Sequence, residues 1–233
     1  MRGPPAPRSL LVTVMRRMFA GCPRAGSSGR RQWLGWLLTP VFWLLAWLRL
    51  IFTGSPRRVI SSYVMPSRRI LQLGDPLLRT VSAPVSTPSA AIPIFEDLRA
   101  TLHEFHRTHG FGRGISAVQI GAPRRLIYIE FEGVAYAIRN PAYEFQSDAK
   151  FRLWDDCFSF PDLLVHLERN QSVRVRYEDE EGKVRLLKAE GALSELLQHE
   201  IDHLDGILAI DRALDRNSLS TREENIRRSG AAR

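Results

Sequence analysis

The run Gln198-His199-Glu200-Ile201-Asp202-His203 combines residue types that can bind and use a metal ion. Residues four positions apart lie on one face of an α-helix, so His199 and His203 can ligate one cation while Glu200 reaches a water molecule beside it. Such a pattern also arises by chance, as two exposed histidines on a helix. Here it lies among the apolar positions of a leucine-rich segment, which favours metal binding.

A third ligand would distinguish between classes of metal-dependent hydrolase. The run His203-Leu204-Asp205-Gly206 resembles the start of a longer protease pattern, but the position of that pattern's third histidine is Ala209, which cannot bind a metal. A protease with a downstream glutamate ligand would need the motif earlier in the chain. The remaining candidate is Cys157, although a buried cysteine is more often a small hydrophobic residue than a ligand.

Hydrophobic periodicity predicts the elements that must position these candidates. Apolar residues at helical spacing predict a helix over 94–109 that ends at Gly110, and a second over 192–204 that carries the two histidines. Alternation of apolar and polar residues predicts strands over 126–131, 134–138, 173–177 and 184–187. Strands followed by one late, buried helix indicate the α+β class.

Two further motifs precede the histidine motif Gln198–His203. Gly112–Gln119 reads GRGISAVQ, and Asp155–Ser159 reads DDCFS. Apart from these motifs, Asp75–Arg79 reads DPLLR near the start of the globular part. In this order and at these separations, the three motifs resemble those of the peptide deformylase family, which are GφGφAAxQ (φ is apolar), EGCLS and QHExDH. The resemblance covers roughly residues 68–212, and three ordered motifs are far more specific than one.

The resemblance implies an α+β fold in which antiparallel sheets pack around a central metal-binding helix. It implies a metal bound by Cys157, His199 and His203, with Fe²⁺ as the usual working ion and Zn²⁺ as a less active substitute. The implied reaction removes the formyl group from the N-terminal Met of nascent proteins and releases formate. N-formylated nascent peptides are therefore the expected substrate.

The same resemblance implies roles for four further residues. Glu200 would take a proton from the attacking water and deliver it to the departing amine. The side-chain amide of Gln119 and the backbone N–H of Phe158 would donate to the oxyanion. Gly114 would allow close approach of the substrate backbone, because glycine has no Cβ.

Two acidic residues depart from the family pattern before the cysteine. Asp155 replaces Glu and is one methylene shorter, so we expect its pairing with Arg169 to be loosened. Asp156 replaces Gly and brings an anion close to the Cys157 sulfur, where it could weaken substrate binding or repel the peptide that follows the formyl group. Phe158 replaces Leu, but its implied role is that of the backbone and should be retained.

Arg113 and Glu195 replace apolar residues at positions that, in the family, line the pocket for the substrate's Met side chain. Burying either charge alone would cost several kcal/mol, so we expect the two to pair across the rim of the pocket. The alternative is that both side chains turn outward into solvent. If they pair, formyl-Met should fit poorly, and the enzyme should be slow or prefer a different, polar first residue.

The formal charge of +8 on this 233-residue chain is unevenly distributed. Residues 1–74 contain 12 Arg and no acidic residue, whereas the rest of the chain has a net charge of −4. The globular part is therefore acidic, and direct nucleic-acid binding is not expected. Only two cysteines are present, which excludes a disulfide-stabilised scaffold.

Composition divides the chain into five expected parts: an organelle targeting segment (1–31), a hydrophobic Trp-rich segment that could anchor in a membrane (32–53), a linker (54–69), the deformylase-like catalytic domain (70–212) and a polar C-terminal tail (213–233) that is expected to be frayed from residue 217. The first part is rich in Arg and Ser and lacks acids, as organelle presequences do. Residues 32–48 carry no charge, which reaches the lower edge of the ~17–25 residues of a membrane span. A retained anchor or interfacial helix, a cleaved leader and a secretory signal sequence remain open.

Three functions compete at this point. The first is a metal-dependent deformylase sent to an organelle, the mitochondrion in preference to the plastid. The second is a deformylase-like paralogue with altered first-residue specificity or weak activity, which acts as a binding module at an organelle ribosome or membrane. The third is a metalloprotease, which would need a ligand that the sequence does not supply.

Overall fold

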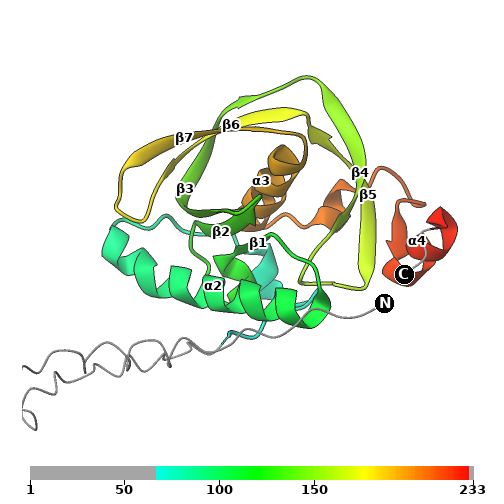
Figure 1. Cartoon of the computed structure of the whole chain (residues 1–233), viewed down its shortest axis with the longest axis horizontal. Helices are drawn as coiled ribbons and strands as arrows, with labels where there is room; N and C mark the ends of the chain where they lie inside the picture. The colour runs from blue at the N-terminus through cyan, green and yellow to red at the C-terminus, as the bar shows by residue number, and fades with distance from the viewer. Residues whose placement is uncertain (1–66, 231–233) are drawn as a thin grey trace, which may run out of the picture. The chain divides into compact units, whose positions relative to one another are not determined.

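The computed structural model describes residues 67–230, and Figure 1 shows their path. The expected targeting segment (1–31), the hydrophobic segment (32–53) and the linker up to residue 66 lie outside the described residues. No helix within 67–230 is both long and apolar enough to cross a membrane. The ordered contacts begin slightly before the expected domain start at residue 70, because the backbone N–H of Arg68 donates to Thr101 Oγ1 at 2.9 Å.

The described part contains helices and strands in alternating runs. In chain order they are η1 (Pro76–Arg79), α2 (Pro88–His109), β1 (Gly114–Ser116), η2 (Ala117–Ile120), β2 (Leu126–Phe131), β3 (Val134–Gln146), β4 (Lys150–Asp156), β5 (Leu163–Asn170), β6 (Ser172–Glu178), β7 (Val184–Glu190), α3 (Gly191–Leu204), η3 (Ala209–Arg212), β8 (Leu219–Thr221) and α4 (Arg222–Ser229). The two expected helices and four expected strands are all present, and β3 continues well past its expected end.

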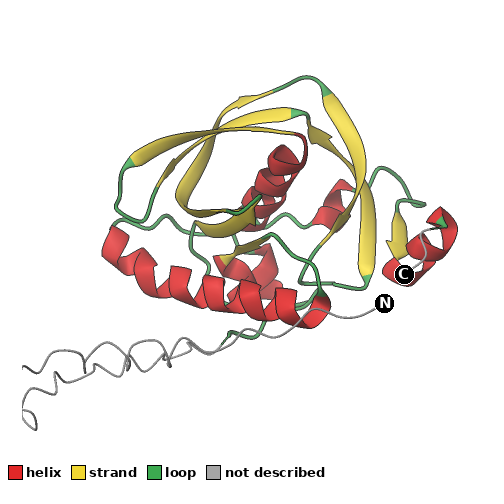
Figure 2. Cartoon of the chain, in the orientation of Figure 1, coloured by secondary structure: helices red, strands yellow, loops and turns green. Residues whose placement is uncertain are grey.

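Two antiparallel sheets enclose helix α3 (Figure 2). One has five strands in the order β1-β2-β3-β6-β7, and the other has three in the order β4-β5-β8. Helix α3 is buried along most of its length, and its Leu197, Ile201 and Leu204 pack against the five-stranded sheet. This arrangement confirms the predicted α+β fold with antiparallel sheets around a central helix.

Helix α2 covers the outside of β1 and β2. Its residues Phe95, Leu98 and Leu102 recur every three to four positions and are almost completely buried against the sheet. The helix begins six residues before its expected start and continues through Pro93, which removes one backbone hydrogen bond without ending the helix. It ends at Gly110, whose φ of 76° is the left-handed conformation that glycine adopts readily.

The expected frayed C-terminal tail is wrong for residues 219–229. Strand β8 pairs antiparallel with β5, with Leu163 opposite Thr221. Helix α4 follows, and the Thr221 side chain caps it by accepting from the backbone N–H of Glu224. Helix α4 buries none of its side chains, so it lacks the apolar periodicity on which the prediction relied.

Candidate metal and substrate site

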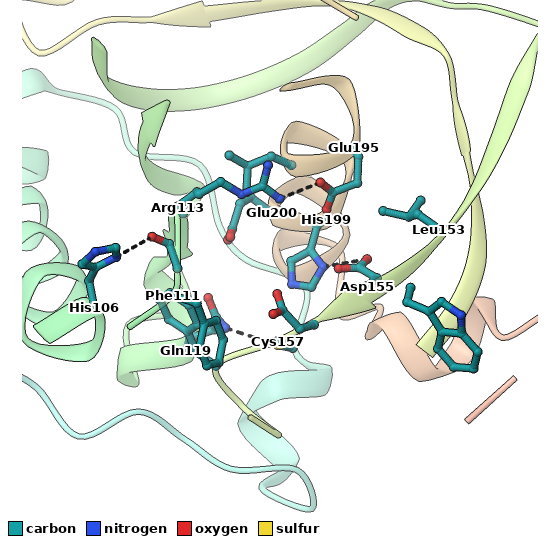
Figure 3. Close-up of a pocket in the computed structure, with 16 residues that line it drawn as sticks. His106, Phe111, Arg113, Gln119, Leu153, Asp155, Cys157, Glu195, His199 and Glu200 are labelled. Atoms are coloured by element: carbon teal, nitrogen blue, oxygen red, sulfur yellow. Dashed lines mark hydrogen bonds and ion pairs between the residues drawn. The ribbon is translucent and has the colours of Figure 1, made fainter. Parts of the chain in front are cut away.

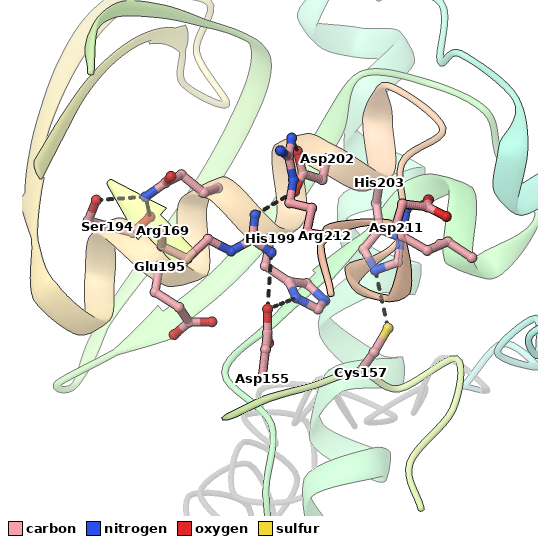
Figure 4. A network of polar contacts seen from close by, with 12 residues as sticks. Asp155, Cys157, Arg169, Ser194, Glu195, His199, Asp202, His203, Asp211 and Arg212 are labelled. Carbon is pink, nitrogen blue, oxygen red and sulfur yellow. Dashed lines mark hydrogen bonds and ion pairs between the residues drawn. The ribbon is translucent and has the colours of Figure 1, made fainter. Parts of the chain in front are cut away.

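Most polar side chains of helix α3 contact strands β4 and β5 and Cys157, while its apolar residues pack against the five-stranded sheet. His199 and His203 are buried and face the end of strand β4 and the Cys157 that follows it (Figure 4). Glu200 is buried beside Ser116 of strand β1. The chain leaves the helix through Gly206, whose φ is 74°. A Cβ at Gly206 would lie 2.5 Å from the carbonyl oxygen of Arg79, so only glycine lets the two segments pack this closely.

Three potential metal ligands converge beside this helix (Figure 4). Ligand atoms of Cys157, His199 and His203 lie within 4.8 Å of one another, and all three residues are buried. The Cys157 sulfur is 3.3 Å from His203 Nε2. One thiolate and two imidazoles form a donor set that suits Zn²⁺ and Fe²⁺ better than Mg²⁺ or Ca²⁺. The residues present therefore fit a first-row transition-metal ion.

A second group of close polar atoms, from Asp155, Glu195 and His199, overlaps the first at His199. Here Asp155 Oδ2 already contacts His199 Nδ1 and accepts from Arg169 Nη2, each at 3.0 Å. An oxygen engaged in this way is an orienting partner for a metal-binding histidine. The group that contains Cys157 is therefore the better metal site.

A buried ionic network supports His199 from behind. Arg169 joins Asp155 to Asp202, and Arg212 binds Asp202 through two hydrogen bonds of 2.5 Å. Burial alone would raise the pKa of Asp155, but His199 and Arg169 outweigh burial and hold this pKa at about 2. The expectation that the shorter Asp155 loosens its pairing with Arg169 is wrong, because the bond has an ordinary length of 3.0 Å.

The two histidines have opposite electrostatic environments. Burial acts to lower the pKa of His199, but the carboxylate of Asp155 outweighs burial and raises the pKa well above its usual value. Burial and the charge on His199 lower the pKa of His203 well below its usual value. The lowered pKa of His203 favours the neutral imidazole, the form that binds metals.

Glu200 is held in place by a hydroxyl group. Ser116 Oγ lies 2.5 Å from Glu200 Oε2 and 2.9 Å from the backbone carbonyl oxygen of Glu200. Burial raises the pKa of Glu200 to about 7, while the charge on His199 and the Ser116 hydrogen bond act in the opposite direction. A Cβ at Gly114 would lie 2.8 Å from Glu200 Oε1, so the glycine also leaves room for this carboxylate.

Gln119 has a fixed orientation beside the cysteine. Its Oε1 accepts from the backbone N–H of Ser116 at 2.9 Å, so its Nε2 must point the other way. Nε2 lies 3.6 Å from the Cys157 sulfur and 3.4 Å from Ser159 Oγ. The amide therefore presents a donor toward the ligand cluster, where an oxyanion formed beside it could be stabilised.

Phe158 follows Cys157 directly, so its backbone N–H lies next to the ligand cluster. Its ring stacks on Phe105 with 3.8 Å between centroids. A Cβ at Gly112 would lie 2.4 Å from this ring, and the φ of Gly112 is 117°. The first glycine of the motif thus permits both the backbone conformation and the packing of the aromatic ring.

One cavity of about 390 Å³ is lined by Cys157, His199 and Glu200 (Figure 3). The same cavity is lined by Arg113 and Glu195, the charged residues that replace apolar ones in the family pattern. Arg113 Nη2 donates to Glu195 Oε2 at 2.8 Å. The Glu195 side chain is 5% exposed and that of Arg113 is 44% exposed, so the pair reaches from the cavity wall to its rim. The expected pairing is confirmed, and the alternative in which both side chains turn into solvent is wrong.

Comparison with known proteins identifies the family to which this chain belongs. The model of the polypeptide deformylase family matches residues 67–218. The peptide deformylase of Bartonella tribocorum is 39% identical over 155 residues, which cover 63% of this chain and 84% of the relative. The chain belongs to the peptide deformylase family. It is thus a metal-dependent hydrolase that removes the N-formyl group from nascent peptides.

Solved deformylase structures share the fold. The peptide deformylase of Thermotoga maritima aligns with a TM-score of 0.60 at 29% identity, over 65% of this chain and all of that one. A deformylase of Acinetobacter baumannii crystallised with Met-Ala-Ser bound aligns with a TM-score of 0.57 at 26% identity, over 63% of this chain and 98% of that one. These likenesses agree with the central helix and two sheets described above.

Two residues of this deformylase site were missed by sequence reasoning. Ser116 occupies an alanine position of the glycine-rich motif, and its contact with Glu200 joins residues 84 positions apart. Arg222 begins helix α4, and its Nη2 donates to Asp156 Oδ2 at 2.8 Å, while its guanidinium lies 4.1 Å from the centre of the Phe111 ring. The replacement of alanine by serine was a visible signal, whereas nothing in the sequence pointed to Arg222.

Proposed function

We propose that this deformylase holds one divalent cation through Cys157, His199 and His203, with Fe²⁺ as the working ion and Zn²⁺ as a less active substitute. The convergence of these ligand atoms within 4.8 Å of one another, with Cys157 and His199 lining the cavity, carries the proposal. When bound, the cation would polarise the formyl carbonyl and lower the pKa of a water molecule. The orientation of His199 by Asp155 supports the same site.

The protein's own groups move the proton and stabilise the developing charge. Glu200 takes a proton from the water that attacks the formyl carbon, and Ser116 holds Oε2 of this carboxylate by a hydrogen bond. The Gln119 amide and the Phe158 backbone N–H donate to the oxyanion. The C–N bond then breaks, Glu200 returns the proton to the amine, and formate and a peptide with a free N-terminus leave.

The proposed substrates are nascent proteins made in an organelle, the mitochondrion in preference to the plastid. The acid-free, Arg-rich composition of residues 1–31 supports import, and the Trp-rich residues 32–53 support membrane association. The organelle ribosome is the proposed partner that presents formylated N-termini. Fractionation of cells that express the full chain with a C-terminal tag tests this, and a tagged protein confined to the cytosol would contradict it.

The decisive experiment measures formate release by the anaerobically purified full chain from formyl-Met-Ala-Ser, the formylated form of the tripeptide bound in the Acinetobacter structure. We expect Glu200→Ala to reduce kcat by about 10²–10⁴-fold with its metal content unchanged. Cys157→Ala should lose both metal and activity. Arg185→Ala, which removes an exposed ion pair with Asp179 at the far hairpin, is the matched control.

A different outcome would favour the second candidate. If the metal-loaded chain releases no formate from this peptide with Fe²⁺ or Zn²⁺, the second candidate is favoured, a deformylase-like paralogue with altered first-residue specificity or weak activity. One observation favours the altered specificity that belongs to this candidate, namely the Arg113–Glu195 pair on the cavity wall.

A further inference from the structure

The Arg113–Glu195 pair lies close to the position of the reacting carbonyl. Glu195 is one helical turn before His199, and the ligand atoms of Glu195, His199 and Asp155 lie within 4.8 Å of one another. Glu195 and Arg113 line the same cavity as Cys157. A formyl group placed among the catalytic residues therefore has this pair as its near neighbour. The side chain of the first substrate residue is the part of a peptide that must lie against it.

The pair leaves hydrogen-bonding groups unused. Within residues 67–230, Arg113 Nη2 to Glu195 Oε2 is the one hydrogen bond made by either side chain. Glu195 Oε1 remains as an acceptor, and Arg113 Nε and Nη1 remain as donors. The wall thus offers an acceptor and donors side by side on a pair whose charges cancel.

An apolar side chain and a polar one would have different effects on this wall. An apolar side chain would displace water from the carboxylate and the guanidinium without replacing the lost hydrogen bonds, which is costly for charged groups. A charged side chain would be attracted by one member of the pair and repelled by the other. A neutral group with both a donor and an acceptor replaces the displaced water on both members.

We propose that Arg113 and Glu195 select formylated peptides whose first side chain carries a hydrogen-bond donor and an acceptor together, with the carboxamide of glutamine as the best match. This inference rests on the proposed function, because it places the formyl group beside Glu200 and Gln119. Formyl-Met, whose thioether is only a weak acceptor, is then a poor substrate for this member of the family.

The experiment compares three peptides whose first side chains have nearly equal length: formyl-Gln-Ala-Ser, formyl-Met-Ala-Ser and formyl-norleucine-Ala-Ser. For the full chain, we expect kcat/KM for the Gln peptide to exceed that for the norleucine peptide by about 10-fold, the effect of one or two net hydrogen bonds. The Met peptide should resemble the norleucine peptide. Calorimetric titration of the same peptides into Glu200→Ala should give the same order of affinities without turnover.

The variant that tests the pair is Arg113→Ile/Glu195→Leu, because Arg113→Ile alone would leave a buried carboxylate without its partner. The double variant should reverse the preference in favour of norleucine and Met. Arg185→Ala is the control that keeps the wild-type order. Preference of the wild type for norleucine over Gln, or the same order in the double variant, would overturn the proposal.

The two proposals fail in different ways. Absence of formate from all three peptides, together with a calorimetric preference for Gln, would contradict only the proposed function. Formate release with no preference in either measurement would contradict only the selection by the charged pair.

Discussion

The cavity has two walls that use charge differently. On the metal side, Asp155, Arg169 and Asp202 form a continuous buried network in which each charged group contacts at least two others. On the substrate side, Arg113 and Glu195 form one hydrogen bond with each other and have further polar atoms directed to the cavity or to solvent.

This difference determines which residues can vary. A group on the metal side has several partners, so its loss leaves other buried charges unpaired, and the ligand geometry depends on it. A pair on the substrate side can be exchanged for apolar residues as a unit, because within residues 67–230 each side chain hydrogen-bonds only to the other. Evolution of specificity is therefore easier on the second wall, and the predictions below test that contrast.

The largest effect is expected from Asp155→Asn. The amide keeps the shape but removes the charge that orients His199 and neutralises Arg169. We expect metal affinity to fall by about 10–100-fold. The free energy of unfolding of the metal-free protein should fall by about 3–5 kcal/mol, since Arg169 is 2% exposed and loses a partner. Metal content after dialysis and urea denaturation measure the two effects.

The matched control for this substitution is Asp179→Asn, which removes a carboxylate paired with Arg185 in the β6–β7 hairpin. It should leave metal retention unchanged. If Asp155→Asn also kept its metal and its stability, the network would not be what positions His199, and the contrast between the two walls would disappear.

A smaller effect is expected from Ser116→Ala, which removes the hydroxyl that contacts Glu200 Oε2. The carboxylate would keep its place on the helix but lose the bond that fixes its rotamer, so kcat should fall by roughly 10-fold while KM and metal content stay the same. Ser220→Ala, which removes another largely buried hydroxyl on strand β8, is the control. A change in KM with constant kcat would show that Ser116 shapes the substrate wall instead.

The helix and its ligands could be predicted because their signals are local. His199 and His203 are four positions apart, which suffices to place them on one face of a helix. Cys157 was a weak candidate by elimination, and only the resemblance of ordered motifs made it an expected ligand, since spacing alone does not connect it to that helix. The Arg113–Glu195 pairing followed from a physical requirement, because a buried charge needs a partner.

What the sequence could not reveal depends on distant contacts. Arg222 is 66 positions from Asp156 and reaches it only because strand β8 pairs with β5. Helix α4 has no buried residue, so no hydrophobic pattern marked it. The hydroxyl of Ser116 contacts Glu200 because strand β1 packs against helix α3. The separation of the two residues in the sequence does not predict this packing.

The smallest effect is expected from Arg222→Ala, which removes the contact between the C-terminal segment (β8 and α4) and Asp156. The side chains of Arg222 and Asp156 are 30% and 36% exposed, so their ion pair should contribute no more than about 1 kcal/mol. Arg222→Ala would leave the Asp156 anion uncompensated beside the path of the substrate peptide, and KM should rise by about 2–5-fold with kcat unchanged.

Asp156→Gly/Arg222→Ala should return KM to its wild-type value, because the anion is then removed as well. If KM stayed high in the double variant, Arg222 would act through its contact with Phe111, and the charge of Asp156 would have no part in the substrate wall.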